Sequence, residues 1–232
     1  MFIPQRAQPH RQGGGFVIRF INSDFARCGS ALEIVGADFE VYNNTFAYNG
    51  WSEDERSGEW ADGVTVHRCD GGSITNNQMA ENTDIGLVVN EGQNCTIRYN
   101  DIWNENRYAF AGFHVSAGNE GGDHSGGLYS DNTIWANQDL MGFGLIVGAE
   151  TWHGTRTSDV GTVGWNYIEG AVINLAVDGI DGGTVTSNTT YRAQGTRGYG
   201  TCNGQSADEF IAAHNGGGAS IQSGWVSRTC HS

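Results

Sequence analysis

The sequence predicts an all-β fold in which the chain winds into stacked coils that carry short strands. One observation behind this prediction is a hexapeptide that recurs along the chain, with an apolar or aromatic residue three positions before an asparagine. Another is a set of short segments in which apolar residues alternate with other residues at a period of two. Such repeats predict a solenoid, because each unit can bury its apolar face only against its neighbours.

The asparagine hexapeptide occurs six times, at spacings of 22 to 34 residues. A basic coil of about 22 residues, lengthened in places by an insertion of about ten, accounts for these spacings. The copies are VYNNTF (41–46), ITNNQM (74–79), IRYNDI (97–102), YSDNTI (129–134), VGWNYI (163–168) and VTSNTT (185–190).

The alternating segments predict strands with one buried face. In the second of them Leu87 and Val89 are expected to point inward, so that Val88 and Asn90 point outward. The segments are DGVTVH (62–67), IGLVVN (85–90), AGFHVS (111–116), FGLIVG (143–148) and INLAVD (173–178).

The repeated asparagine is expected to be structural. A turn that is buried between the turns of neighbouring coils needs partners for its backbone polar groups. An asparagine tolerates the left-handed backbone conformation, and its amide can donate and accept at once, so asparagines in register can form a ladder. The predicted ladder consists of Asn44, Asn77, Asn100, Asn132, Asn166 and Asn188.

Over roughly residues 15 to 192 these repeats resemble the GIxVxxxxxxxIxxNxI units of right-handed parallel β-helix proteins of the pectin-lyase-like superfamily. The resemblance implies a single-stranded right-handed parallel β-helix of about seven coils with an Asn ladder. The segment SADE (206–209) is typical of a helix start, so we also expect a short C-terminal capping helix that ends at Asn215 and Gly216. The expected division is an N-terminal extension (1–14), the parallel β-helix (15–196) and a C-terminal cap segment (197–232).

The composition limits the classes of partner. The formal net charge is −14, with twelve arginines and no lysine, which argues against nucleic acid and anionic membrane surfaces as partners. No apolar run approaches the roughly 18 residues of a membrane span. The first coil begins almost at once and without a cap, so we expect self-association at the uncapped N-terminal end, or a longer parent chain.

The five cysteines have no zinc-site spacing, so no metal centre is predicted from them. Cys202 and Cys230 flank the final segment and could close it as a disulfide, which would imply an oxidising compartment. The alternative is five buried thiols. We expect a secreted or cell-surface protein.

The outward residues of the alternating segments share one sheet. In the family that the chain resembles, this sheet is the floor of the substrate groove and the loops at its ends are the walls. The longest insertions, 49–61, 117–127 and 149–159, lie at those ends and are rich in acids, histidine and tryptophan. Such a groove suits a sugar chain, because tryptophan faces stack on sugar rings and carboxylates bind hydroxyls.

Six residues are candidates for catalysis. His114 is expected to face outward between Val88 and Ile146, where it is either a general acid or base or a plain surface histidine. Asp178 lies near Asp181 in a glycine-rich turn, as a catalytic carboxylate, a calcium ligand or an ordinary strand end. Asp62 has the same ambiguity, although its phase points it inward. The candidates are His114, Asp178, Glu150, His67, His153 and Asp123.

Five residues are candidates for substrate binding, chiefly because they lie at the predicted groove. They are Asn90, Trp152, Trp51, Arg107 and His124. For each loop residue the alternative is a solvated side chain without a role. Trp103 and Trp135 occupy equivalent places after the asparagine motif, so they should stack as an outward aromatic ladder, as a second sugar platform or a subunit contact.

The resemblance implies a carbohydrate-active enzyme, a lyase or glycoside hydrolase that cleaves a polysaccharide. The local signatures of polygalacturonases, pectin methylesterases and alginate epimerases are missing, so the reaction stays open. Calcium is the one cofactor that the resemblance brings into consideration. The alternative is a non-catalytic glycan-binding or structural β-helix module of a larger surface protein.

Overall fold

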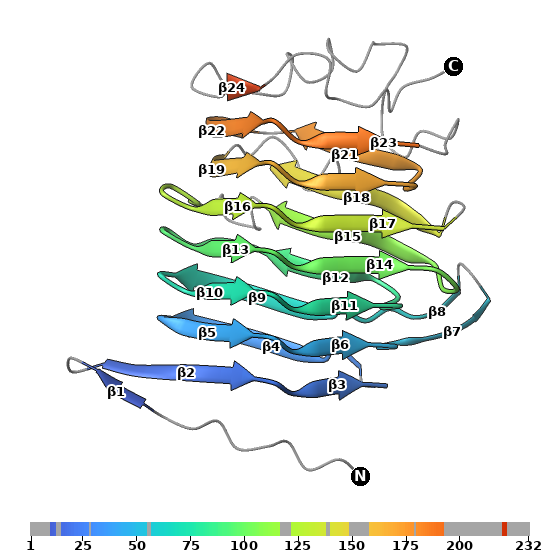
Figure 1. Ribbon diagram of the computed structural model, residues 1–232, viewed down its shortest axis with the longest axis horizontal. Helices are drawn as coiled ribbons and strands as arrows, with labels where there is room; N and C mark the ends of the chain where they lie inside the picture. The colour runs from blue at the N-terminus through green and yellow to red at the C-terminus, as the bar shows by residue number, and fades with distance from the viewer. Residues whose placement is uncertain are drawn as a thin grey trace.

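A computed structural model describes residues 10–12, 15–27, 29–54, 57–116, 122–137, 140–148, 158–178, 180–192 and 220–221. The chain winds into a stack of coils whose strands form three long sheets (Figure 1). Neighbouring strands within these sheets are parallel, except that β1 pairs with β2 in antiparallel fashion. The predicted all-β solenoid is therefore confirmed.

Each coil contributes strands to the sheets in a fixed order. The nine-stranded sheet contains β1 (His10–Gln12), β2 (Gly15–Ile21), β5 (Phe39–Tyr42), β10 (Ser73–Thr75), β13 (Thr96–Arg98), β16 (Leu128–Ser130), β19 (Ser158–Gly164), β22 (Ile180–Thr186) and β24 (Ser220–Ile221). The seven-stranded sheet contains β3 (Asp24–Ala26), β6 (Thr45–Ala47), β11 (Gln78–Ala80), β14 (Asp101–Asn104), β17 (Thr133–Ala136), β20 (Tyr167–Glu169) and β23 (Thr189–Tyr191). The six-stranded sheet contains β4 (Leu32–Ala37), β9 (Val64–Asp70), β12 (Ile85–Val89), β15 (Ala109–Ser116), β18 (Met141–Gly148) and β21 (Ile173–Asp178).

The seven-stranded sheet takes one strand from each of seven coils, which agrees with the predicted size of the solenoid. The predicted capping helix lies outside the described residues. Within the described part of the chain, no helix has the length and apolar character that crossing a membrane requires.

The core is built from rows of apolar side chains in register along the coils. In the nine-stranded sheet Val41, Ile74, Ile97, Tyr129 and Val163 follow one another across paired strands, and all are fully buried. Such a row gains its stability from neighbouring coils, because no single coil can enclose its own apolar face.

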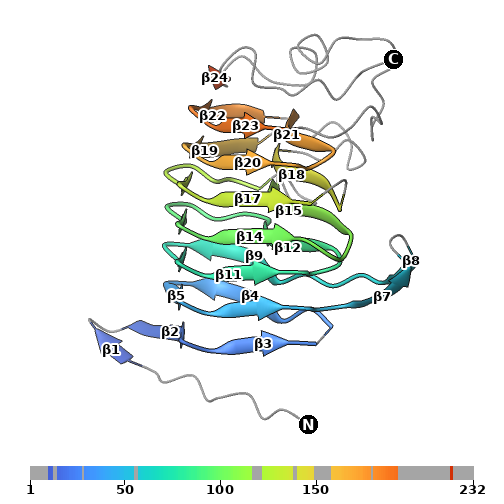
Figure 2. The ribbon, with the colours of Figure 1, turned by 45° about the vertical axis from the view of Figure 1, so that its right-hand side comes forward.

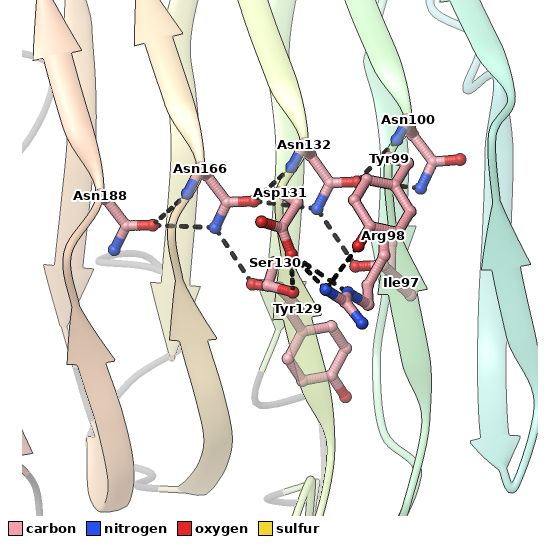
Figure 3. Close-up of polar contacts among 10 residues, drawn as sticks. All are labelled: Ile97, Arg98, Tyr99, Asn100, Tyr129, Ser130, Asp131, Asn132, Asn166 and Asn188. Carbon is pink, nitrogen blue, oxygen red and sulfur yellow. Dashed lines mark hydrogen bonds and ion pairs between the residues drawn. The ribbon is translucent and has the colours of Figure 1, made fainter.

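The asparagine ladder is confirmed, and Figure 3 shows four of its members. From Asn77 onward, each ladder side chain accepts at Oδ1 from the backbone nitrogen and from Nδ2 of the asparagine one coil earlier, as Asn132 does from Asn100 at 3.0 and 2.9 Å. Asn44, the first member, accepts from the backbone nitrogen of Ser23 at 2.9 Å. Each Nδ2 also donates to a backbone carbonyl, as Asn132 does to Ile97 at 3.2 Å. The six asparagines are buried, with at most 2% of their surface exposed.

The left-handed conformation does not belong to the ladder asparagines, contrary to expectation. It belongs to the residue that precedes each of them, with φ between 54° and 57°. This residue makes the corner between two strands, while the asparagine follows it and turns its amide inward. The corner residues are Asn43, Asn76, Tyr99, Asp131, Trp165 and Ser187.

A second, shorter asparagine column was not predicted. Asn49 donates from Nδ2 to Oδ1 of Asn82 at 2.8 Å, and Asn104 donates to the backbone oxygen of Asn82 at 3.2 Å. All three are buried. The signal was present in the sequence, because Asn49 and Asn82 each follow a ladder asparagine by five positions.

One disulfide joins Cys69 to Cys95, with a sulfur–sulfur distance of 2.02 Å. Both cysteines are fully buried. The sequence reasoning missed this bond, because the two residues are 26 positions apart and meet only when the end of β9 stacks on the turn before β13. The predicted pair, Cys202 and Cys230, lies outside the described residues.

Candidate functional site

The outer face of the six-stranded sheet carries a row of side chains that pair across consecutive strands. The row begins with Glu33 on β4 and Thr65 on β9 and continues through Val88 and His114 to Ile146. Val88 and Ile146 therefore flank His114, as the sequence predicted.

The part of this row toward the C-terminus is apolar and closed. Val88, Ile146 and Phe143 belong to a second hydrophobic cluster, separate from the core, and each is at most 7% exposed. His114 is fully buried, and its Nε2 lies 3.4 Å from the backbone oxygen of Gly148. This burial differs from the exposed groove floor that we expected for His114, because apolar neighbours on the outer face enclose it.

The part toward the N-terminus is polar and open. His67 follows Thr65 on β9, and its Nε2 lies 2.5 Å from Oε1 of Glu33 on the neighbouring strand. Its Nδ1 lies 3.4 Å from the amide nitrogen of Asn90, at the end of β12. The side chains of His67 and Glu33 are 42% and 64% exposed, so solvent reaches both. Two residues that the sequence singled out, His67 and Asn90, are thus brought together, and Glu33 joins them.

Asp62 lies beside this group, in the turn before β9. Its carboxylate accepts from the hydroxyl of Thr65 and, at 3.2 Å, from the backbone nitrogen of Ile85. Burial raises the pKa of Asp62 above its ordinary value of 3.8, and these hydrogen bonds and the nearby His114 and His67 offset only part of that effect. Asp62 precedes β9, and its largely buried carboxylate contacts Thr65 of the outward row.

A hairpin leads into this site. The insertion at 49–61 forms β7 (Trp51–Asp54) and β8 (Ser57–Glu59), which extend away from the stack of coils (Figure 2). Trp60 follows the hairpin and is 47% exposed, with edge contacts at 6.4 Å to the rings of Tyr108 and Phe110. The sequence reasoning did not single out Trp60, although it lies only two positions before Asp62. The side chain of Trp51 lies outside the described part of the structure.

A model of the right-handed beta helix region matches residues 11–162, about two thirds of the chain. The chain belongs to the right-handed beta helix family. No curated protein and no solved structure gives a significant match. The family match agrees with the parallel coils of the structure, and it leaves the reaction undetermined.

Arg107 of this β-helix protein holds backbone in place, and its side chain does not project as a free cation. Its guanidinium donates to the backbone oxygens of Glu81 at 2.9 Å and Gly50 at 2.7 Å. Burial lowers the pKa of Arg107 from its ordinary value. The buried carboxylate of Glu81 in turn accepts from the backbone nitrogens of Glu105, Asn106 and Arg107. We expected Arg107 to bind substrate, but these contacts support a structural role.

His124 is fully buried, whereas we expected it on a groove wall. Its Nδ1 lies 2.7 Å from the hydroxyl of Tyr129, and its Nε2 lies 2.6 Å from the backbone oxygen of Ser116. Burial lowers the pKa of His124, which favours the neutral ring. These contacts tie the end of β15 to the start of β16.

Asp123 lies at the turn before β16, and its backbone oxygen accepts from the backbone nitrogen of Gly92 at 3.0 Å. Its carboxylate accepts from Nε2 of Gln93 at 2.6 Å and from the backbone nitrogen of Ser125 at 2.8 Å. These hydrogen bonds lower the pKa of Asp123. Asp123 is exposed, but its partners are those of a turn.

The remaining predicted residues are not placed. Glu150, Trp152 and His153 lie outside the described residues, and for Asp178 only the backbone is described, pairing with Gly148 at the end of β21. In the described part of the chain, no three histidine, cysteine or acidic side chains come close enough to hold a metal ion. The expectation of calcium therefore stays a prediction.

Proposed function

We propose that this protein is a secreted or cell-surface enzyme that cleaves a polysaccharide at the open, polar part of the six-stranded sheet. The observation that carries the proposal is the meeting of His67, Glu33 and Asp62 on one surface, two of them joined by a 2.5 Å contact. Titratable groups that lie together on an accessible face, one with a raised pKa, are typical of catalytic sites.

His67 is the proposed general base. When its Nε2–H donates to Glu33, Nδ1 carries the lone pair, and Asn90 contacts that nitrogen only at 3.4 Å. Water or a sugar hydroxyl can replace this long contact. Glu33 would then fix the tautomer of the ring and stabilise the imidazolium that forms when Nδ1 takes a proton.

Asp62 is the proposed general acid. Because burial raises its pKa, it holds a proton at higher pH than an ordinary aspartate does. A protonated carboxyl can deliver that proton to the glycosidic oxygen as the bond breaks.

The substrate class follows from charge. The formal net charge of −14 opposes the approach of a polyuronate, so an uncharged polysaccharide and hydrolysis are favoured over elimination. The disulfide between Cys69 and Cys95 supports an oxidising compartment, as expected for a protein that meets polysaccharides outside the cell.

The test is cleavage of a panel of neutral and uronate polysaccharides, with and without calcium, followed by reducing ends and by absorbance at 235 nm. We expect new reducing ends without absorbance on a neutral chain. His67→Ala should lower the rate by about a hundredfold or more, and Glu33→Gln and Asp62→Asn should also lower it. Glu40→Gln, on the outer face of another sheet, is the matched control. Cleavage that survives His67→Ala would refute this site.

A further inference from the structure

A second surface, on the outer face of the seven-stranded sheet and the corners that precede its strands, gathers aromatic side chains over four consecutive coils. Ile102, Ile134 and Ile168 point into the core, so the residues on either side of each point outward. We call this surface the aromatic face. It consists of Tyr99, Trp103, Trp135, Trp165, Tyr167 and Tyr191.

These aromatic residues are aligned by strand register. Trp103 pairs with Trp135 across β14 and β17, and their rings stack at 6.2 Å with an interplanar angle of 3°. The predicted aromatic ladder is thereby confirmed. Tyr99 and Trp165 occupy the corner position of their coils, on either side of the corner residue Asp131. Because neighbouring coils are about 4.8 Å apart, Trp103 and Trp135 lie one coil step apart along the stack, and Tyr99 and Trp165 lie two steps apart.

Much of this face is open to solvent. Tyr99 and Trp165 are each 53% exposed, Tyr191 is 51% exposed and Tyr167 is 38% exposed. Single exposed aromatic residues are common, but several that lie together mark an interaction surface.

Charged partners hold the exposed rings in place. The Arg98 guanidinium lies 4.6 Å from the centre of the Tyr99 ring, and it donates to the Tyr99 hydroxyl and to Asp131, both at 2.7 Å (Figure 3). At the other end Tyr167 donates to Glu169 at 2.6 Å. Rings that are already ordered lose less entropy when a ligand binds.

The charges of the face indicate an uncharged ligand. Its two cations are already paired, Arg98 with Asp131 and Arg192 with Glu169 at 3.6 Å. The net charge of the whole chain also repels polyanions. Aromatic rings offer apolar faces to the C–H surfaces of sugars, and carboxylates and tyrosine hydroxyls can bind sugar hydroxyls.

We propose that the aromatic face binds an uncharged polysaccharide chain that runs along the stack of coils. This site is separate from the His67 group, because it lies on a different sheet. It would hold the protein on its polymer whether or not the polymer is cut at the other face.

The test is retardation in native gels that contain xyloglucan, barley β-glucan, arabinoxylan, galactomannan or polygalacturonate. The variant is Tyr99→Asn with Trp165→Asn, because asparagine occupies the same corner position at Asn43 and Asn76 and tolerates its left-handed backbone. We expect at least one neutral polysaccharide to retard the wild type, and the double variant to bind it about tenfold more weakly.

Tyr42→Ala is the matched control, since Tyr42 is 40% exposed on the nine-stranded sheet, away from both proposed sites, and it should leave retardation unchanged. His67→Ala should bind like the wild type, which separates this proposal from the catalytic one. No retardation by any neutral polysaccharide, retardation by polygalacturonate alone, or an unchanged double variant would overturn the proposal. A dimer that the double variant dissociates, measured by light scattering without any change in retardation, would instead assign the face to a second copy.

Discussion

Asn100 donates from Nδ2 to Oδ1 of Asn132 at 2.9 Å, although 32 positions of sequence separate them. Asn100 also donates to the backbone of Ile74 and accepts twice from Asn77, so its amide joins three coils. A side chain that satisfies so many buried groups cannot be removed without leaving some of them unpaired.

Asn100→Ala should therefore lower the free energy of unfolding by roughly 2–4 kcal/mol. Several hydrogen bonds of about 1 kcal/mol each are lost, and their buried partners are left without a hydrogen bond. Urea unfolding followed by circular dichroism measures this. The control is Gln78→Ala, on the exposed outer face near the ladder, which should change little. Equal losses in the two variants would contradict the structural role of the ladder.

A close approach between coils makes Gly112 intolerant of a side chain. A Cβ at Gly112 would lie 2.5 Å from Cγ2 of Ile134 and 2.8 Å from the backbone oxygen of Gly144. Gly112→Ala should destabilise the protein by about 1–3 kcal/mol through overpacking. Gly36→Ala is the control, because a Cβ there would meet nothing within 4 Å. Thermal unfolding compares the two, and a Gly112→Ala variant as stable as Gly36→Ala would rule out the predicted clash.

The ionised carboxylate of Asp62 should lower the free energy of unfolding at neutral pH. Its pKa is raised in the folded protein, so the folded state holds the proton more tightly than the unfolded chain does. Stability therefore falls as the pH rises from the ordinary value of 3.8 through the folded pKa, and the loss is complete above it. Asp62→Asn removes this loss and keeps an acceptor for the backbone nitrogen of Ile85.

We expect Asp62→Asn to be more stable than the wild type at pH 7, because the neutral amide avoids the cost of burying an ionised carboxylate. The difference should vanish at pH 3.5. Melting temperatures at the two pH values measure it, with exposed Asp24→Asn as the control. If Asp62→Asn is also inactive, the carboxylate is kept for function at the expense of stability. A destabilised variant at pH 7 would contradict this account.

The disulfide should stabilise the second and third coils. Cys69 and Cys95 enclose a loop with a sequence separation of 26, for which the loss of chain entropy in the unfolded state predicts about 3.5 kcal/mol. The Cys69→Ala, Cys95→Ala double variant should unfold at lower urea concentration by that amount. Reductant should destabilise the wild type more than the double variant. Equal sensitivity of both proteins to reductant would show that the bond does not form.

The sequence by itself determined the solenoid, because every coil of the fold needs the same residue types at equivalent positions, and this need appears as a repeat in the sequence. Each coil must place an apolar residue in the core rows and an asparagine in the ladder, so Asn77, Asn100 and Asn132 could be found from spacing alone. The stacking of Trp103 on Trp135 followed from the same argument, because equivalent positions in parallel coils are neighbours.

Only the tertiary structure decided which polar residues meet and which are closed off. His67 and His114 have the same strand phase, yet one is open beside Glu33 and the other is buried under an apolar cluster. Likewise His124 looked like a loop residue, but it packs against Tyr129 in the interior. Sequence spacing determines the face of the sheet on which a side chain lies. Its exposure and its partners depend on side chains from other coils. Those side chains become its neighbours only when the chain has folded.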